Sequence, residues 1–155
     1  KFGTVYSKTA IAAQKKSFFI AFGRYMSPVP SVFGEPVSWL NYRTGVKHIY
    51  FRIELAADAC TVGLYISGAE PEKRQALFDK LQLFTSLLPV SPSTHWHWQP
   101  QAVDENGQTI ARVAITIGPV HFMQTGDWPA IIAFLKEHLL QLDHFWFEVK
   151  EFFHP

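Results

Sequence analysis

Hydrophobic and polar side chains alternate along two neighbouring segments, and this alternation predicts the centre of the fold. In residues 46–56 the apolar side chains from Ile49 to Leu55 occupy odd positions, while the even positions carry His48, Tyr50, Arg52 and Glu54. A period of two places these polar side chains on one face of a β-strand and the apolar ones on the other. After a turn at residues 57–58, residues 60–67 alternate in the same way, which predicts a long antiparallel hairpin.

Three longer segments show the spacing of amphipathic helices, with apolar residues three or four positions apart. The first covers residues 7–26 and the second covers residues 71–88. The third begins at Asp127, a predicted N-cap, and continues almost to the C-terminus, with Pro129 in its first turn, where proline is tolerated.

Shorter segments predict three further strands, over residues 37–43, 95–99 and 108–117. The sequence DENG at residues 104–107 favours a hairpin turn between the last two. The expected fold is therefore α+β, with an antiparallel sheet of about five strands and three helices in the order α-β-β-β-α-β-β-α. We expect residues 1–155 to form a single domain.

Composition narrows the class of protein. Fourteen Lys and Arg balance thirteen Asp and Glu, so a net charge of +1 provides no general attraction to nucleic acid or an anionic membrane. Cys60 is the single cysteine, which excludes an internal disulfide and a cysteine-based zinc cluster. No apolar run approaches the roughly 20 residues that span a bilayer, and the first residues lack the apolar block of a signal peptide. We therefore expect a cytoplasmic protein without membrane contact.

Five segments spread over nearly the whole chain combine aromatic, basic and turn residues: 22–26 (FGRYM), 28–30 (PVP), 39–52 (WLNYRTGVKHIYFR), 127–130 (DWPA) and 142–146 (LDHFW). Together they resemble a bacterial and archaeal family called domain of unknown function 4268, and NYRTG is the more specific part. The resemblance implies a small separate protein or the C-terminal part of a longer chain with a nuclease domain. Some members resemble the restriction-endonuclease-like superfamily, whose core order matches the first hundred residues of the predicted fold.

That superfamily implies a metal-dependent nuclease, and the sequence supplies only part of its motif. The chemistry needs an acid on the second core strand, an acid two positions before a lysine on the third, and a divalent cation such as Mg²⁺ between them. Glu54 is the candidate first acid, but residues 61–67 contain neither an acid nor a lysine. Lys47 lies seven positions from Glu54, so the two side chains would point to opposite faces of a regular strand.

The polar face of the hairpin is the first candidate site. It combines the even positions of the first strand with outward positions of the neighbouring strands, namely His48, Tyr50, Arg52, Glu54, Thr61, Gly63, Tyr65, Arg112 and Thr116. Arg52 and Arg112 suit a phosphate or carboxylate. Two alternatives remain: a solvated face with an Arg–Glu pair, and a small-molecule pocket between sheet and helices lined by Tyr50, Arg52 and Tyr65.

A second candidate site precedes the hairpin and interleaves aromatic and basic side chains: Trp39, Asn41, Tyr42, Arg43, Lys47 and His48. Such a cluster can stack bases and contact phosphates of a single-stranded nucleic acid. Alternatively, Trp39 is a core ring and Asn41 stabilises a turn.

Two histidines share one predicted strand face, His95 and His97, while Trp96 and Trp98 share the other. A zinc site would need further ligands that the neighbouring sequence does not supply. Exposed histidines and buried tryptophans account for the pattern better, and we expect no metal.

Aromatic residues crowd the end of the last helix, which carries Phe145, Trp146, Phe147, Phe152 and Phe153. At about 100° per residue, the three consecutive rings spread over about 200° of the helix, more than one core-facing stripe needs. This surface predicts a homodimer or docking to another protein; alternatively, the C-terminal segment buries both sides within the monomer.

These observations predict a non-enzymatic binding or accessory domain without a cofactor. It would self-associate or dock through its aromatic helix and offer an anion or nucleic-acid site on the polar hairpin face. The alternative is a divergent metal-dependent nuclease with a degenerate active site that uses Glu54.

Overall fold

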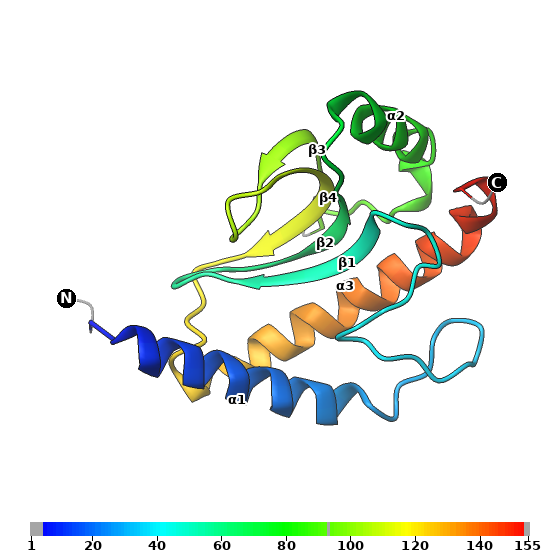
Figure 1. Cartoon of the computed structure of the whole chain (residues 1–155). Helices are drawn as coiled ribbons and strands as arrows, with labels where there is room; N and C mark the ends of the chain where they lie inside the picture. Colours follow the sequence, from blue (N-terminus) through cyan, green and yellow to red (C-terminus); the bar gives the residue numbers. More distant parts are fainter. Residues whose placement is uncertain (1–4, 93, 154–155) are drawn as a thin grey trace.

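A computed structural model describes residues 5–92 and 94–153, and the strands in it form one antiparallel sheet (Figure 1). The strands are β1 (Ile49–Leu55), β2 (Cys60–Ile66), β3 (His97–Val103) and β4 (Thr109–Ile117). They lie in the order β1-β2-β4-β3, so β1 and β3 are the two edges of the sheet.

Three helices share one core with a single face of this sheet. They are α1 (Lys8–Met26), α2 (Pro71–Gln82) and α3 (Trp128–Val149). In Figure 1 α3 runs along the sheet, and α1 lies beside α3. Helix α2 lies at the upper right end of the sheet. None of the helices in the described parts of the chain has the length and apolar character needed to cross a membrane.

Helix α1 confirms the first predicted helix almost residue for residue. Ser7 is its N-cap, and the Ser7 hydroxyl oxygen accepts a hydrogen bond from the Ala10 amide at 3.1 Å. The buried stripe consists of Phe18, Phe22 and Met26, at the spacing that places them on one side of the helix. The helix thus contributes aromatic surface to the core from its C-terminal half.

The hairpin of β1 and β2 is confirmed, with the predicted division of faces. Phe51 pairs with Leu64 and Ile53 with Val62, so their side chains point together toward the helices. Arg52 pairs with Gly63 on the opposite face. The strand begins at Ile49 rather than residue 46, because His48 has a positive φ of 72°, which a regular strand does not accommodate.

The predicted strand over residues 37–43 is wrong, and these residues belong to a loop. The Tyr42 hydroxyl donates a hydrogen bond to Asp143 of α3, and the Trp146 indole donates to the Thr44 carbonyl at 3.0 Å. A second Asp143 oxygen accepts the Val32 amide at 2.5 Å. Tyr42 and the adjacent Thr44 therefore attach the loop to α3 instead of pairing in the sheet.

The sheet consequently has four strands, not five, in the order α-β-β-α-β-β-α. The two strands between the first helices do not confirm the three-strand core order that the restriction-endonuclease-like comparison requires. The predicted strand at residues 95–99 is shifted toward the C-terminus, because β3 spans His97–Val103.

Two predicted helices end earlier than expected. Helix α2 stops at Gln82, where the Thr85 hydroxyl donates a 2.5 Å hydrogen bond to the Gln82 carbonyl, and a short 3₁₀ helix, Thr85–Leu87, follows. Helix α3 gives way at its C-terminus to the 3₁₀ helix Lys150–Phe153. The apolar pattern continues through both 3₁₀ segments, which explains why periodicity alone extended the helices.

The turn between β3 and β4 folds the hairpin toward the polar face of the sheet. Asp104 Oδ1 accepts the amides of Asn106 and Gln108, both at 2.9 Å, and Gly107 supplies a φ of 80°. The pairing register of β3 with β4 shifts between Gln99 and Ala102, which bends the ribbon. This bend positions the turn over the face that the helices leave open.

Candidate functional site

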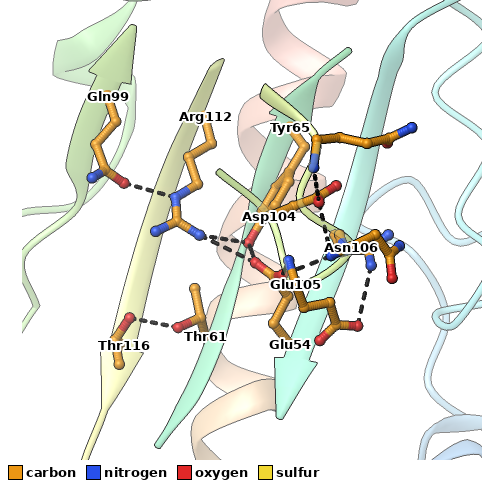
Figure 2. A network of polar contacts seen from close by, with 11 residues as sticks. Glu54, Thr61, Tyr65, Gln99, Asp104, Glu105, Asn106, Arg112 and Thr116 are labelled. Carbon is orange, nitrogen blue, oxygen red and sulfur yellow. Dashed lines mark hydrogen bonds and ion pairs between the residues drawn. The ribbon is translucent and has the colours of Figure 1, made fainter. Parts of the chain in front are cut away.

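Glu54 is the centre of a hydrogen-bonded network on the polar face of the sheet (Figure 2). Its Oε1 accepts hydrogen bonds from the Tyr65 hydroxyl and from Arg112 Nη1, the latter at 3.2 Å. Its Oε2 accepts the backbone amide of Glu105 at 2.7 Å. Both carboxylate oxygens are therefore occupied by groups of the protein itself, and the Glu54 side chain is only 12% exposed.

Tyr65 and Arg112 extend the network across β2 and β4. Arg112 Nη1 donates to the Tyr65 hydroxyl at 2.9 Å, and Arg112 Nε donates to the Gln99 side-chain oxygen at 2.7 Å. Tyr65 has no exposed surface. Burial, followed by its hydrogen bond to Glu54, raises the pKa of Tyr65 well above its ordinary value. The phenol is thus held protonated as a donor to the carboxylate.

The loop between β3 and β4 encloses this network. Figure 2 shows Asp104, Glu105 and Asn106 lying across the strands that carry Glu54 and Tyr65. Glu105 Oε1 lies 3.1 Å from Arg52 Nη2, which joins the loop to β1. Arg52 Nε lies 3.8 Å from Glu54 Oε2, is buried, and has no hydrogen-bond partner among the described residues.

The charged side chains of the polar face therefore bind one another. Arg52 and Arg112 both face carboxylates of the protein, so an anion binding there would have to displace Glu54 or Glu105. The expected pairing of Arg with Glu is present. Thr61 and Thr116, the outermost predicted members, hydrogen bond to each other at 2.7 Å.

In the described parts of the chain, Glu54 contacts the side chains of Tyr65, Arg112 and Arg52 and the backbone amide of Glu105, and none of these groups is a second carboxylate. The ideal Cβ of any side chain at Gly63, beside Arg52, would lie 2.5 Å from the Val113 carbonyl oxygen. An acid therefore cannot be placed at residue 63 without moving backbone. In the described parts of the chain, no three His, Cys, Asp or Glu side chains form a group that could hold a metal ion.

The second predicted site is divided between the core and the surface. Trp39 is buried and its indole donates to the Val29 carbonyl at 2.8 Å, which agrees with the alternative that Trp39 is a core ring. Tyr42 stacks on Phe51 with ring centroids 4.0 Å apart. The polar members stay exposed, namely Asn41, Arg43, Lys47 and His48. The aromatic rings are thus not available beside the basic groups as a stacking platform.

The tryptophan and histidine positions around β3 match their expected orientations. His95 and His97 are exposed, Trp96 is buried, and Trp98 is half-buried with its ring 6.0 Å from that of Phe78 in α2. The histidines therefore lie outside the core, as the predicted alternation of faces requires.

The aromatic end of α3 is only partly buried. Phe145, Trp146 and Phe153 are core residues, whereas Phe147 is 41% exposed and Phe152 is 55% exposed. The two exposed rings contact neighbouring aromatics: Phe147 stacks on Phe33 at 5.4 Å, and Phe152 lies 5.0 Å from Phe84. Folding of the monomer therefore accounts for three rings and leaves part of the other two at the surface.

A cavity of about 430 Å³, the β1 groove, follows the outer edge of the sheet. Its walls come from residues 50–53 of β1 and from Phe19, Trp39, Leu40, Glu105 and Leu139. Consecutive strand residues point to opposite faces, so a cavity that touches four in a row lies at the strand edge. The helix side of the groove is apolar, and the other side carries Tyr50, Arg52 and Glu105.

Tyr50 and Arg52 were predicted to line a pocket between sheet and helices, and both line the β1 groove. Tyr65, the third predicted member, lies in the enclosed network instead. Sequence reasoning missed Phe19, Leu40 and Leu139, because each belongs to a different element. It also missed the buried Asp143, although an acid between the apolar Leu142 and the aromatic run at residues 145–147 was a usable signal.

Comparison with known proteins identifies one family. The family model described as Domain of unknown function (DUF4268) matches residues 14–150, which include the sheet, α2, α3 and most of α1. No curated protein and no solved structure gave a match.

Proposed function

The chain belongs to the family described as Domain of unknown function (DUF4268), and we propose that it is a non-catalytic docking domain that binds a segment of another protein in the β1 groove. The observation that carries the proposal is the groove itself, an amphipathic cavity at a free sheet edge. Its volume of about 430 Å³ is comparable with that of ordinary ligand pockets.

The character of the groove favours a polypeptide over a phosphate-rich ligand. Phe19 and Leu40 present an apolar wall with the buried Leu139 behind it, which suits a hydrophobic side chain. Among the described residues that line the groove, Arg52 is the single cation, and it already faces Glu105, so these residues give the polar wall no surplus positive charge. A nucleic acid would need such a surplus to bind its backbone.

The occupied carboxylate of Glu54 supports a non-catalytic role. A nuclease would use this group to hold a divalent cation. In the folded chain its oxygens instead accept hydrogen bonds from Tyr65, Arg112 and the Glu105 amide. These contacts connect β1, β2, β4 and the β3–β4 loop, which suits a structural function.

The proposal can be tested with a random library of 12-residue peptides displayed on phage and selected on the immobilised protein. Leu40 is 44% exposed and lines the groove, so Leu40→Trp fills the groove from a position where added volume costs little stability. Leu83→Trp is the matched control, because Leu83 is 79% exposed and lies outside the groove.

We expect the selected peptides to bind the wild-type protein and Leu83→Trp equally, and Leu40→Trp about tenfold or more weakly. Equal binding to all three proteins would place the site elsewhere and contradict the proposal. A selection that recovers no binding peptide would contradict it as well.

A further inference from the structure

Building on the proposed function, we infer that the occupant of the β1 groove is an extended segment that pairs with β1 as an additional strand. Its side chains would alternate between an apolar residue facing the helices and a hydrogen-bond acceptor facing Arg52. The partner is therefore defined by its extended backbone and by side chains that alternate between apolar groups and hydrogen-bond acceptors.

The backbone of β1 offers free hydrogen-bonding groups toward the groove. The Ser67 amide donates to the His48 carbonyl at 2.8 Å, and the Ala56 amide donates to the Ala59 carbonyl at 2.9 Å. Antiparallel ladders alternate, so the even residues of β1 bond to β2 and the odd residues point outward. No described residue hydrogen bonds to the backbone of Phe51 or Ile53 from outside the strand.

The outward edge is closed at one end. The Thr44 hydroxyl donates to the Ile49 carbonyl at 2.6 Å, so the loop before β1 already occupies the first outward acceptor. The free edge therefore begins at Phe51, where the groove lies. Unpaired edges of this kind are the templates on which other chains add strands.

Side chains of an added strand would meet different surroundings on its two faces. On the helix side they would contact Phe19 and Leu40, two apolar lining residues that keep exposed surface, which calls for apolar residues. On the other side they would approach Arg52, whose Nε has no hydrogen-bond partner among the described residues. A carboxylate or side-chain amide there would accept a hydrogen bond from the partly exposed Arg52 guanidinium.

The walls of the groove favour a single flexible segment as the occupant, rather than the sheet edge of a second copy of the chain. Phe19 and Leu40 flank the edge on the helix side, and Glu105 flanks it on the polar side. An extended peptide fits between such walls, whereas a second folded sheet brings its own covering helices into the same space. Dimerisation through β1 is thus an alternative outcome that a measured molecular mass would reveal.

Ile53→Pro and Ile53→Ala form a matched pair for the test. Proline removes the outward N–H of residue 53 without removing a ladder bond to β2, and edge strands tolerate it at such positions. Alanine removes the same apolar side chain and keeps the N–H. We expect Ile53→Pro to bind the selected peptides about tenfold more weakly than Ile53→Ala.

Synthetic peptides provide a second measurement that does not depend on folding of a variant. Each amide of a selected peptide is N-methylated in turn, and binding to the wild-type protein is measured. Strand addition predicts that methylation weakens binding at alternate positions, because only alternate N–H groups face β1. Glu105→Gln should strengthen binding of peptides that carry a carboxylate, because it removes the negative charge that competes for Arg52. The substitution keeps the hydrogen bond from the backbone N–H of residue 105 to Glu54.

The outcomes separate the two proposals. Peptides that lose binding to Leu40→Trp but not to Ile53→Pro, and that show no alternation on N-methylation, would overturn strand addition and leave the docking function standing. Peptides insensitive to Leu40→Trp would overturn both. A protein that dimerises at the concentrations of the assay, with the peptides dissociating the dimer, would replace the single segment by a second copy and overturn this inference.

Discussion

Arg52 of β1 and Glu105 of the β3–β4 loop form an ion pair of 3.1 Å across the polar face of the sheet. Both residues also line the β1 groove. The pair therefore lies between the network around Glu54 and the outer edge of β1. The loop thus closes the face on which the sequence predicted a site and forms one wall of the groove beside it.

The network around Glu54 predicts a stability effect. Glu54→Ala would leave the buried Tyr65 hydroxyl without its acceptor and remove the carboxylate that pairs with Arg112, at a cost of about 2–4 kcal/mol. Glu54→Gln keeps one acceptor oxygen and should cost less. Urea unfolding measures both. A Glu54→Ala protein as stable as wild type would show that the network does not support the fold.

Asp143 predicts a second stability effect, at the contact between α3 and the loop before β1. Asp143→Ala removes the acceptor of the Tyr42 hydroxyl and the Val32 amide and should cost about 2–4 kcal/mol. Tyr42→Phe removes one of these bonds and should cost about 1 kcal/mol. Limited proteolysis should cut the loop faster in Asp143→Ala, with the exposed Asp79→Ala as control. Unchanged cleavage would disprove the anchoring role.

Alkaline conditions should destabilise the protein through its buried tyrosines. Burial is the main cause that raises the pKa of Tyr42, Tyr65 and Tyr50, and hydrogen bonds to Asp143 and Glu54 add to the first two. The unfolded chain releases phenol protons near pH 10, whereas the folded chain retains them. Stability is therefore complete below about pH 10 and falls as the pH rises above it.

The midpoint of urea unfolding at pH 8 and at pH 11 measures this loss, and Tyr42→Phe combined with Tyr65→Phe should reduce it. The tyrosinate absorbance of the folded wild-type protein near pH 10 should equal that of the folded Tyr42→Phe, Tyr65→Phe double variant, and a larger absorbance in the wild type would contradict the raised pKa values of Tyr42 and Tyr65.

Cys60 should be nearly inert in the folded protein. Burial raises the pKa of its thiol to about 12, and the side chain is almost fully buried at the start of β2. Reaction with a thiol reagent at pH 8 should be slower by about a hundredfold or more than in the unfolded chain, since each pKa unit lowers the thiolate fraction about tenfold. Equal rates would show that β2 opens readily.

Local patterns predicted the elements whose own apolar positions repeat at a regular spacing. The faces of β1 and β2 follow from alternation, and α1 follows from the spacing of Phe18, Phe22 and Met26. Residues 37–43 were misassigned because the Tyr42 side chain and the adjacent Thr44 carbonyl bind α3, about a hundred residues away. No local pattern contains that contact.

The candidate site could be predicted only in part, for the same reason. Arg52 and Glu54 share a face because of strand parity, which sequence alone shows. Whether that face stays open depends on the β3–β4 loop, which binds Glu54. The bend of this loop comes from a register shift between β3 and β4, which are far from β1 in the sequence. The β1 groove requires Phe19, Leu40 and Leu139 to meet at one edge, and each comes from an element with its own pattern.

Amide hydrogen exchange at β1, recorded by NMR with and without a selected peptide, tests the central claim most directly. In the free protein, the outward amides of Phe51 and Ile53 should exchange faster than those of Arg52 and Glu54, which face β2. The peptide should slow exchange at Phe51 and Ile53 by about tenfold or more and leave Arg52 and Glu54 unchanged. Binding without added protection at Phe51 and Ile53 would contradict strand addition at the free edge of the sheet.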